Sequence, residues 1–255
     1  MAFGLPAIKY IESLPAPKSK KAGSITVLVV APTRELAMQT HDVLSSLGQP
    51  LHLNSVCIYG GVPKDAQKQM LNKSNTRIVV GTPGRIIDLC NEGALDLSSV
   101  SYLVLDEADR MLDKGFENDI RTIISSCKKG TERHTMMFSA TWPMSVRQLA
   151  NDFMNSPIRI TVGSDELTAS LSVEQKVTVL EDGRMKDSEL IKVLNKEGFR
   201  SGAGGQKGTQ RDKVLVFALY KKEAARVERF LQMKGYQVGC IQGQSCLLTA
   251  RMRLM

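Results

Sequence analysis

The chain has 255 residues, with 34 Lys and Arg against 26 Asp and Glu and a net charge of +8. Apolar residues make up 42% and charged residues 24%, an ordinary globular mixture that excludes disorder over the whole length. No stretch reaches the ~18 consecutive apolar residues of a membrane-spanning helix, so a membrane is not an expected partner. Met1–Ile11 has neither the charged region nor the cleavage site of a signal peptide.

The five cysteines form no metal-binding or redox pattern. They are Cys57, Cys90, Cys127, Cys240 and Cys246, and no pair has the Cys-x-x-Cys spacing. Only three histidines are present, so a metal site built from His or Cys is not expected. Such cysteines fit free thiols in a reducing compartment. The positive charge permits nucleic-acid binding without requiring it.

Over residues 1–162, short β-branched runs alternate with helical patterns. This rhythm predicts an α/β fold, a mostly parallel sheet with helices on both faces. The predicted strands are Ser24–Val30, Ser55–Tyr59, Arg77–Val80, Tyr102–Leu105 and Thr135–Phe138. The predicted helices are Arg34–Ser46, Pro63–Leu71, Arg85–Asn91, Glu117–Ser126 and Pro143–Met154. Because the strands are nearly continuous apolar runs, we expect both faces of the sheet to be covered.

Residues 163–174 are polar and are predicted to be a linker. A second α/β unit is expected over residues 175–241. Its predicted strands are Gln175–Leu180, Lys213–Phe217 and Gln237–Ile241, and its predicted helices are Lys186–Lys196 and Lys221–Lys234. Residues 201–210 have the composition of a flexible loop, and the tail 242–255 shows no clear period.

Candidate functional segments follow the ends of the five strands predicted in residues 1–162. They are Ala31–Ala37, Gly60-Gly61, Gly81–Arg85, Asp106–Asp109 and Ser139–Thr141. In an open parallel sheet, ligands bind just past the carboxyl ends of the strands. The sequence therefore predicts that small, hydroxyl and charged residues meet at one edge of the sheet.

The acidic segment Asp106–Asp109 follows the apolar run Tyr102–Leu105. A carboxylate at the end of a buried strand can hold Mg²⁺ through water, and a neighbouring Glu can orient an attacking water. The structural alternative is that these acids only stabilise the N-terminus of the next helix. Placement after a buried strand is similar to the Walker B strand of nucleotide hydrolases and favours the chemical interpretation.

The other segments each allow a structural and a functional interpretation. Thr33 and Thr141 can belong to helix caps, and Gly60-Gly61 permits either a turn or a close backbone approach to a ligand. Arg34 beside the free N–H groups of a helix start makes a phosphate site. Arg85 is either a phosphate-binding fork or a surface charge.

In order and spacing, these segments resemble the motifs of the DEAD-box RNA helicases. The matching residues are Pro32–Ala37 (PTRELA), Gly60-Gly61, Thr82–Arg85 (TPGR), Asp106–Asp109 (DEAD) and Ser139–Thr141 (SAT). Leu215–Phe217 resembles the strand of the next motif, so the match extends from residue 1 to about 241. Phe138–Pro143 and Lys213–Ala218 resemble the ribosome-biogenesis branch, which implies rRNA processing in the nucleus or nucleolus, with the cytoplasm as the alternative.

The resemblance implies two RecA-like domains that close around ATP and single-stranded RNA. It implies that Asp106 contacts Mg²⁺ through water and that Glu107 activates the hydrolytic water. It further implies that Asp109, Ser139 and Thr141 couple the nucleotide to domain closure. The implied contacts to the RNA backbone, which read no base sequence, come from Pro32, Thr33, Arg34, Gly60, Gly61, Thr82, Pro83, Gly84 and Arg85.

The chain departs from the family pattern in two places. No glycine is followed by lysine, so the Gly-x-x-x-x-Gly-Lys phosphate loop is absent; the family places it just before a segment resembling Ala2–Ala7. At the other end Gln242-Gly243 stands where the family has His-Gly, and no arginine-finger motif follows. We therefore expect the first domain to lack its phosphate-loop strand and the second to be incomplete. We also expect little or no ATPase activity and low stability.

Two other functions fit the same residues. A non-catalytic RNA-binding fragment would use Arg34 and Arg85 without hydrolysis, and its binding would depend on salt but not on ATP. A DNA-directed helicase of a related group is the second alternative. The combination of Asp106–Asp109 with Ser139–Thr141 favours RNA, and competition between RNA and DNA oligonucleotides would decide.

Overall fold

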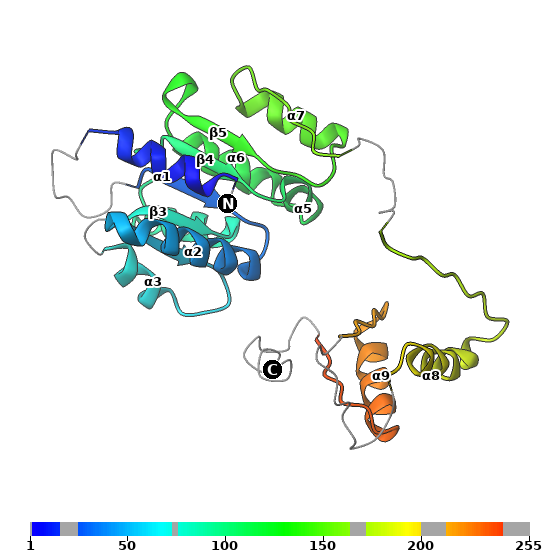
Figure 1. Ribbon diagram of the computed structural model, residues 1–255. Coiled ribbons are helices and arrows are strands. Elements are labelled where there is room, and N and C mark those ends of the chain that lie inside the picture. Colours follow the sequence, from blue (N-terminus) through cyan, green and yellow to red (C-terminus); the bar gives the residue numbers. More distant parts are fainter. Residues whose placement is uncertain (1, 16–24, 73–75, 164–171, 200–212, 242–255) are drawn as a thin grey trace. The chain divides into compact units, whose positions relative to one another are not determined.

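The computed structural model describes residues 2–15, 25–72, 76–163, 172–199 and 213–241 (Figure 1). Its internal contacts divide the chain into two units, Met1–Asp165 and Glu166–Met255. The domain boundaries expected from the sequence stay a prediction. The predicted loop 201–210 and the tail 242–255 lie outside the described residues.

The first unit is built on a parallel sheet with the strand order β2-β3-β1-β4-β5. The strands are β1 (Val27–Val30), β2 (Asn54–Ile58), β3 (Thr76–Gly81), β4 (Tyr102–Leu105) and β5 (His134–Met137). Each predicted strand is therefore confirmed to within a few residues at its ends. The central position of β1, between β3 and β4, explains why its four residues are all buried.

Helices cover both faces of this sheet, as predicted (Figure 1). One face packs against α1 (Gly4–Ser13) and α2 (Arg34–Gly48). The opposite face packs against α3 (Lys64–Leu71), α4 (Pro83–Asn91), α5 (Ala108–Asp113), α6 (Glu117–Ser126) and α7 (Met144–Phe153). The helices α1 and α5 lie in segments where the sequence pattern predicted none.

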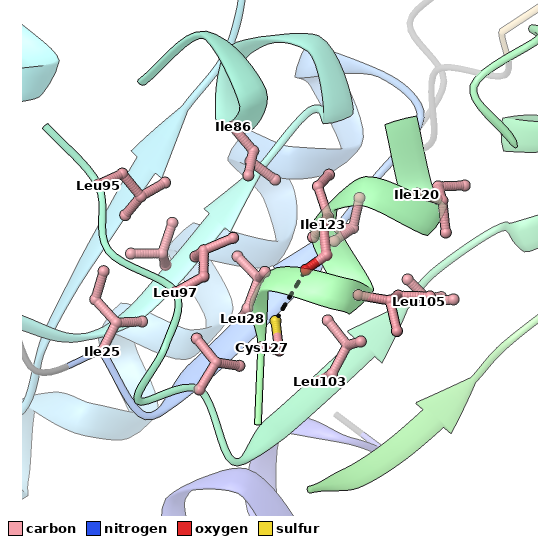
Figure 2. Close-up of a cluster of buried hydrophobic side chains, with 14 of the residues drawn as sticks. Ile25, Leu28, Ile86, Leu95, Leu97, Leu103, Leu105, Ile120, Ile123 and Cys127 are labelled. Carbon is pink, nitrogen blue, oxygen red and sulfur yellow. Dashed lines mark hydrogen bonds between the residues drawn. The ribbon is translucent and has the colours of Figure 1, made fainter. Parts of the chain in front are cut away.

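The larger of the two hydrophobic clusters lies under α4 and α6 (Figure 2). Leu28 of β1 and Leu103 of β4 meet Ile123 of α6 there, and all three are almost fully buried. Burying one such side chain contributes roughly 1.5–3 kcal/mol. Cys127 donates from Sγ to the carbonyl of Ile123 at 3.2 Å, and burial raises the pKa of this thiol to about 12. Cys127 is therefore a protonated packing residue at neutral pH.

Two neighbouring strands differ sharply in burial. All four residues of β4 are buried, whereas none of the four in β5 is. The reason is topological, because β5 pairs with β4 alone among the described residues and so forms one edge of the sheet. Short 3₁₀ turns at Gln49–Leu51 and Gly130–Glu132 complete the first unit.

The second unit contains the 3₁₀ turn Gly183–Met185 and the helices α8 (Lys186–Lys196) and α9 (Lys221–Met233). Both predicted helices are confirmed. Arg226 of α9 donates two hydrogen bonds to the carboxylate of Asp187 on α8, at 2.6 and 2.9 Å. Leu194 and Leu231 are buried. No described helix of the chain is both long and apolar enough to cross a bilayer.

The three strands predicted in the second unit are wrong for the described residues. Gln175–Leu180, Lys213–Phe217 and Gln237–Ile241 carry no strand assignment. Val177 is 90% exposed and Phe217 is 87% exposed. A strand needs a neighbour to take up its N–H and C=O groups, and the described part of this unit offers none.

Candidate functional site

The strands of the first unit end at the same level of the sheet. Val30 lies beside Gly81 and Leu105, Gly81 beside Ile58, and Leu105 beside Met137. The five segments that follow therefore start from one edge, as the sequence predicted. Two polar networks form there, one around the acidic segment and one around the glycine-rich turn.

The acidic segment begins with a strained turn. Glu107 has φ 51° and ψ 54°, a left-handed conformation that costs a residue with a side chain about 1–2 kcal/mol. The backbone N–H of Glu107 donates to Oδ1 of Asp106 at 3.1 Å. The Glu107 side chain makes no capping hydrogen bond to α5. Helix capping therefore does not account for the Glu107 carboxylate, and the strain suits a site that must aim a side chain.

Asp109 joins the acidic segment to the segment after β5. Its Oδ2 accepts from the hydroxyl of Thr141 at 2.7 Å and from the backbone N–H of Thr141 at 3.0 Å. Ser139 Oγ accepts from the Asp109 N–H at 3.3 Å and donates to the Thr141 carbonyl at 2.7 Å. Burial alone would raise the pKa of Asp109, but these hydrogen bonds outweigh it and lower the pKa. Thr141 thus binds a carboxylate, and the N-cap position of α7 belongs to Pro143, which makes no side-chain capping bond.

Asp106 differs from Asp109 in its partners. Burial is the main reason that the pKa of Asp106 is raised, and the nearby Glu107 charge adds to the rise. Within the described residues no three His, Cys, Asp or Glu side chains gather as a metal cage. Mg²⁺ is commonly held by one or two carboxylates together with substrate phosphates. Asp106, a partly buried carboxylate at a strand end, fits that second arrangement.

The segment after β1 places a cation beside the glycine pair. Thr33 caps α2, because its Oγ1 accepts from the Leu36 N–H at 3.2 Å. Arg34 Nε donates to Glu35 Oε1 at 3.1 Å. Its Nη1 lies near Gly61. A Cβ on Gly61 would stand 3.3 Å from Arg34 Nη1, and Gly61 has φ +83°. Both the close approach and the backbone conformation therefore favour glycine at this position.

Two other glycines have open space beside them. A Cβ on Gly60 or Gly84 would meet nothing within 4 Å. Packing in the first unit therefore gives no reason for glycine at either position, and a ligand that approaches the backbone closely would supply one. Pro83 occupies the first turn of α4, while Thr82 makes no side-chain capping bond. The Thr82 hydroxyl is thus not committed to the helix.

Arg85 is not the exposed cation that its place in the sequence suggested. It is 6% exposed. Nη1 donates to Gln67 Oε1 at 2.8 Å, and Nη2 donates to the Val62 carbonyl at 2.9 Å. The sequence analysis missed Gln67, which is 3% exposed. Its only available signal was a polar residue four positions before Leu71, a spacing that places both side chains on the same inner face of α3.

Lys114 is a second residue that the sequence pattern did not single out. It follows α5, and its Nζ donates to the carbonyl of Pro32 at 3.1 Å. Pro32 opens the segment that holds Thr33 and Arg34. This hydrogen bond is a direct physical link between the helix that follows the acidic segment and the loop that carries Arg34.

A family model for DEAD/DEAH box helicases matches residues 1–149 of this chain. The chain belongs to the DEAD/DEAH box helicase family. It is 53% identical over 249 residues to the ATP-dependent RNA helicase DBP3 of Mycosarcoma maydis, a match that covers 95% of this chain and 41% of the relative. It is 51% identical over 243 residues to the ATP-dependent RNA helicase DBP3 of Saccharomyces cerevisiae, covering 95% and 43%. The chain therefore spans less than half the length of these curated relatives.

Solved structures support the same assignment for the fold. A DEAD box protein from Methanococcus jannaschii aligns with a TM-score of 0.54 and 30% identity, covering 99% of this chain and 61% of that one. A hypothetical ATP-dependent RNA helicase from Sulfolobus tokodaii aligns with a TM-score of 0.51 and 34% identity, covering 61% and 42%. The DEAD-box resemblance and the RecA-like α/β fold expected from the sequence are thereby confirmed.

Proposed function

We propose that this DEAD-box chain is the part of an ATP-dependent RNA helicase that holds the RNA backbone and supplies carboxylates to Mg–ATP. The observation that carries the proposal is the meeting of two networks at one sheet edge. One network joins Asp109 to Thr141, and the other joins Arg85 to the glycine-rich turn. Family membership supports RNA and Mg–ATP as the ligands of this edge.

On the RNA side, the proposed contacts are backbone N–H groups, hydroxyls and one exposed cation. They come from Pro32, Thr33, Arg34, Gly60, Gly61, Thr82, Pro83 and Gly84, whereas Arg85 is buried. Arg34 is the strongest candidate for a phosphate contact, because its side chain is 43% exposed and lies beside Gly61. Such groups grip sugar and phosphate without reading bases, which suits an enzyme that acts on many duplexes.

On the nucleotide side, we propose that Asp106 holds Mg²⁺ through water and that Glu107 orients the attacking water. Bound Mg–ATP would supply the phosphoryl group and a cation that neutralises its charge. The left-handed turn at Glu107 sets the direction of the Glu107 carboxylate. The hydrogen bonds of Asp109 join the acidic segment to Ser139 and Thr141. These bonds would transmit a change at the nucleotide to the segment after β5.

The phosphate loop is the part of the catalytic apparatus that these 255 residues do not contain, since no glycine precedes a lysine. Its amides and lysine hold the triphosphate in P-loop enzymes. We therefore expect this chain to show no more RNA-stimulated ATP hydrolysis than its Glu107→Gln variant, measured in parallel as the control. Hydrolysis that Glu107→Gln abolishes would show that other residues replace the phosphate loop.

RNA binding is the experiment that tests the proposal for this chain. Fluorescence anisotropy with a labelled single-stranded RNA, titrated at several salt concentrations, gives both affinity and salt dependence. Arg34→Gln should weaken binding. It should also make the negative slope of log affinity against log salt shallower by about 0.7, the value for one lost phosphate contact on a single strand. The matched control is Arg121→Gln, because the Arg121 guanidinium is already held by Glu117 and Asp152.

Three results would change the assignment. Equal effects of Arg34→Gln and Arg121→Gln would remove Arg34 from the RNA site. Tighter binding of a DNA strand of the same sequence would favour a DNA-directed helicase. RNA affinity of the full-length protein that ATP leaves unchanged would favour a non-catalytic RNA-binding role. The nucleolar, rRNA-processing assignment is likewise a proposal, supported by the resemblance of Phe138–Pro143, and localisation of a tagged full-length protein would check it.

A further inference from the structure

Gln67 and Arg85 form a buried polar pair that the proposed function does not yet use. Gln67 lies on α3 and Arg85 lies in the first turn of α4. We propose that they are positioning residues, which hold the loop from Tyr59 to Val62 against the start of α4 and so fix the geometry of the RNA-backbone site. This inference rests on the proposed function and assigns Arg85 to the support of that site.

The pair ties together both ends of the glycine-rich loop. Gln67 Nε2 donates to the carbonyl of Tyr59 at 3.1 Å, just before Gly60. Arg85 Nη2 donates to the carbonyl of Val62 at 2.9 Å, just after Gly61. The Arg85 Nη1 bond to Gln67 Oε1, at 2.8 Å, closes the chain of contacts. The two loop residues between these anchors, Gly60 and Gly61, are the ones proposed to face RNA.

The same loop is close-packed against the end of β3. The N–H of Thr82 donates to the Ile58 carbonyl at 3.1 Å. A Cβ on Gly81 would stand 2.8 Å from that carbonyl oxygen. The ends of β2 and β3 are therefore fixed by backbone contacts, and the Gln67–Arg85 pair extends this fixed geometry beyond the strands. Arg34 Nη1 lies close to Gly61. The position of Gly61 therefore also limits where the Arg34 guanidinium can lie.

Burial explains why Arg85 is better suited to support than to phosphate binding. Arg85 is 6% exposed and Gln67 is 3% exposed. Reaching a phosphate would break two hydrogen bonds and leave the Val62 carbonyl and Gln67 without their donor, which is costly for buried groups. The Arg85 Nε has no hydrogen-bond partner among the described residues, and Asp88 Oδ2 lies 3.9 Å from it. Asp88 is in turn 3.5 Å from Lys64.

The geometry also requires an arginine in particular. Two different nitrogens of one planar guanidinium reach two acceptors on separate segments. A lysine carries one ammonium at the end of a flexible stem and cannot reproduce that fork. A phosphate contact that needed only charge would tolerate lysine, whereas a positioning contact would not. Arg85→Lys therefore separates the two roles.

The test uses the whole chain, four single variants and one double variant. Gln67→Met removes both polar atoms and keeps the length of the side chain. Arg85→Lys keeps the charge. Gln69→Met is the matched control, because Gln69 is exposed on the same helix. Affinity for a single-stranded RNA is measured by anisotropy over a range of salt concentrations, well below the melting temperature of every variant.

If the pair positions the loop, Gln67→Met and Arg85→Lys should each weaken RNA binding roughly 10- to 150-fold, the range for losing a charge-assisted hydrogen bond. The salt slope should stay unchanged in both, because no phosphate contact by a cation is lost. The double variant should bind about as weakly as either single variant, because the two side chains act as one unit. Gln69→Met should bind like the starting protein.

Wild-type affinity in both Gln67→Met and Arg85→Lys would overturn the inference. Ile124→Val is a buried substitution on α6, away from the loop. If it lowers the melting temperature as much as Gln67→Met or Arg85→Lys does and weakens RNA binding equally, the inference is also overturned. NMR order parameters of the amides of Gly60, Gly61 and Val62 give a readout that needs no RNA. Lower order parameters in Gln67→Met, with no RNA binding by the starting protein, would retain the support role and reject the proposed function. Unchanged order parameters would reject the support role itself.

Discussion

The two units of this chain have similar sequence patterns and different structures. Tyr102–Leu105 in the first unit and Val214–Phe217 in the second are both short apolar runs. The first run is β4, which is fully buried between β1 and β5. The second is extended and largely exposed, with Leu215 at 71% and Phe217 at 87%. An apolar run is therefore only a candidate strand until a partner completes its hydrogen bonds.

The comparison has an energetic side. In the first unit, each strand gains ladder hydrogen bonds and buries side chains on both faces, and the two gains offset the entropy of fixing the backbone. In the second unit, the described runs gain neither. Its two helices are joined by Arg226 and Asp187, and Leu194 and Leu231 are the buried apolar side chains of its described part.

Amide hydrogen exchange should break or sharpen this comparison most strongly. We expect the amides of β1 and β4 to exchange ~10³-fold or more slowly than unstructured amides, as core strands of a stable domain do. The amides of Val214–Phe217 should exchange at nearly unstructured rates. Mass spectrometry of peptides from the two regions measures both in one sample. Protection over Val214–Phe217 would mean that a partner strand forms in solution and would end the contrast.

A pair of leucine substitutions gives the next largest effect. Leu103→Ala removes a side chain that is 0% exposed, and such changes cost about 2–5 kcal/mol of unfolding free energy. Leu215→Ala removes one that is 71% exposed and should change it by less than about 0.5 kcal/mol. The fluorescence of Trp142, the only tryptophan, reports the first unit during urea unfolding, and far-UV circular dichroism reports the helices of both units. Equal midpoint shifts for the two variants would contradict the assigned burial.

Much of the fold was predictable because local pattern and packing agree in the first unit. The run Val27–Val30 predicts a buried strand, and it is one. The helix α5 was missed because its six residues are too few to show a helical period. The helix α1 was missed because its short apolar face follows no capping signal; Phe3 makes no side-chain cap. In the second unit, the same local signals predicted strands that pair with no other described segment.

For the site, the sequence predicted which segments share an edge but not what each side chain does there. Order along the chain and the rule for parallel strands were enough to bring Asp109 and Thr141 together. They could not distinguish Arg34, which is exposed, from Arg85, which is buried. That difference depends on Gln67, a residue of a separate helix. A sequence motif does not show which of its side chains contact residues of a separate helix.

The carboxylates of the two units sharpen the comparison at the level of charge. Hydrogen bonds from Thr141 and its neighbours lower the pKa of Asp109 against the effect of burial. The hydrogen bond from Arg226 is the main reason that the pKa of Asp187 is lowered. A carboxyl group with a lowered pKa stabilises the fold above its unfolded pKa of ~3.9, and that contribution is lost as the pH falls through the folded pKa.

Asp109→Asn should therefore cost about 1–3 kcal/mol at pH 7, because it weakens a buried, charge-assisted acceptor. Asp187→Asn should cost less, because its ion pair faces solvent. The difference between Asp109→Asn and the starting protein should shrink as the pH falls below ~4, where the carboxyl of the starting protein takes up its proton. Urea unfolding at pH 7, 5 and lower values measures these effects, followed at Trp142 for Asp109→Asn and by far-UV circular dichroism for Asp187→Asn.

Asp106 supplies a check of opposite sign within the same experiment. Its pKa is raised, chiefly by burial, so the folded state takes up a proton more readily than the unfolded state does. At pH 7 the ionised Asp106 therefore costs stability, and that cost disappears as the pH falls through the raised pKa. Asp106→Asn should stabilise the first unit by up to about 1 kcal/mol at pH 7. A loss of stability instead would mean that Asp106, like Asp109, is held by the fold rather than kept ready for a cation.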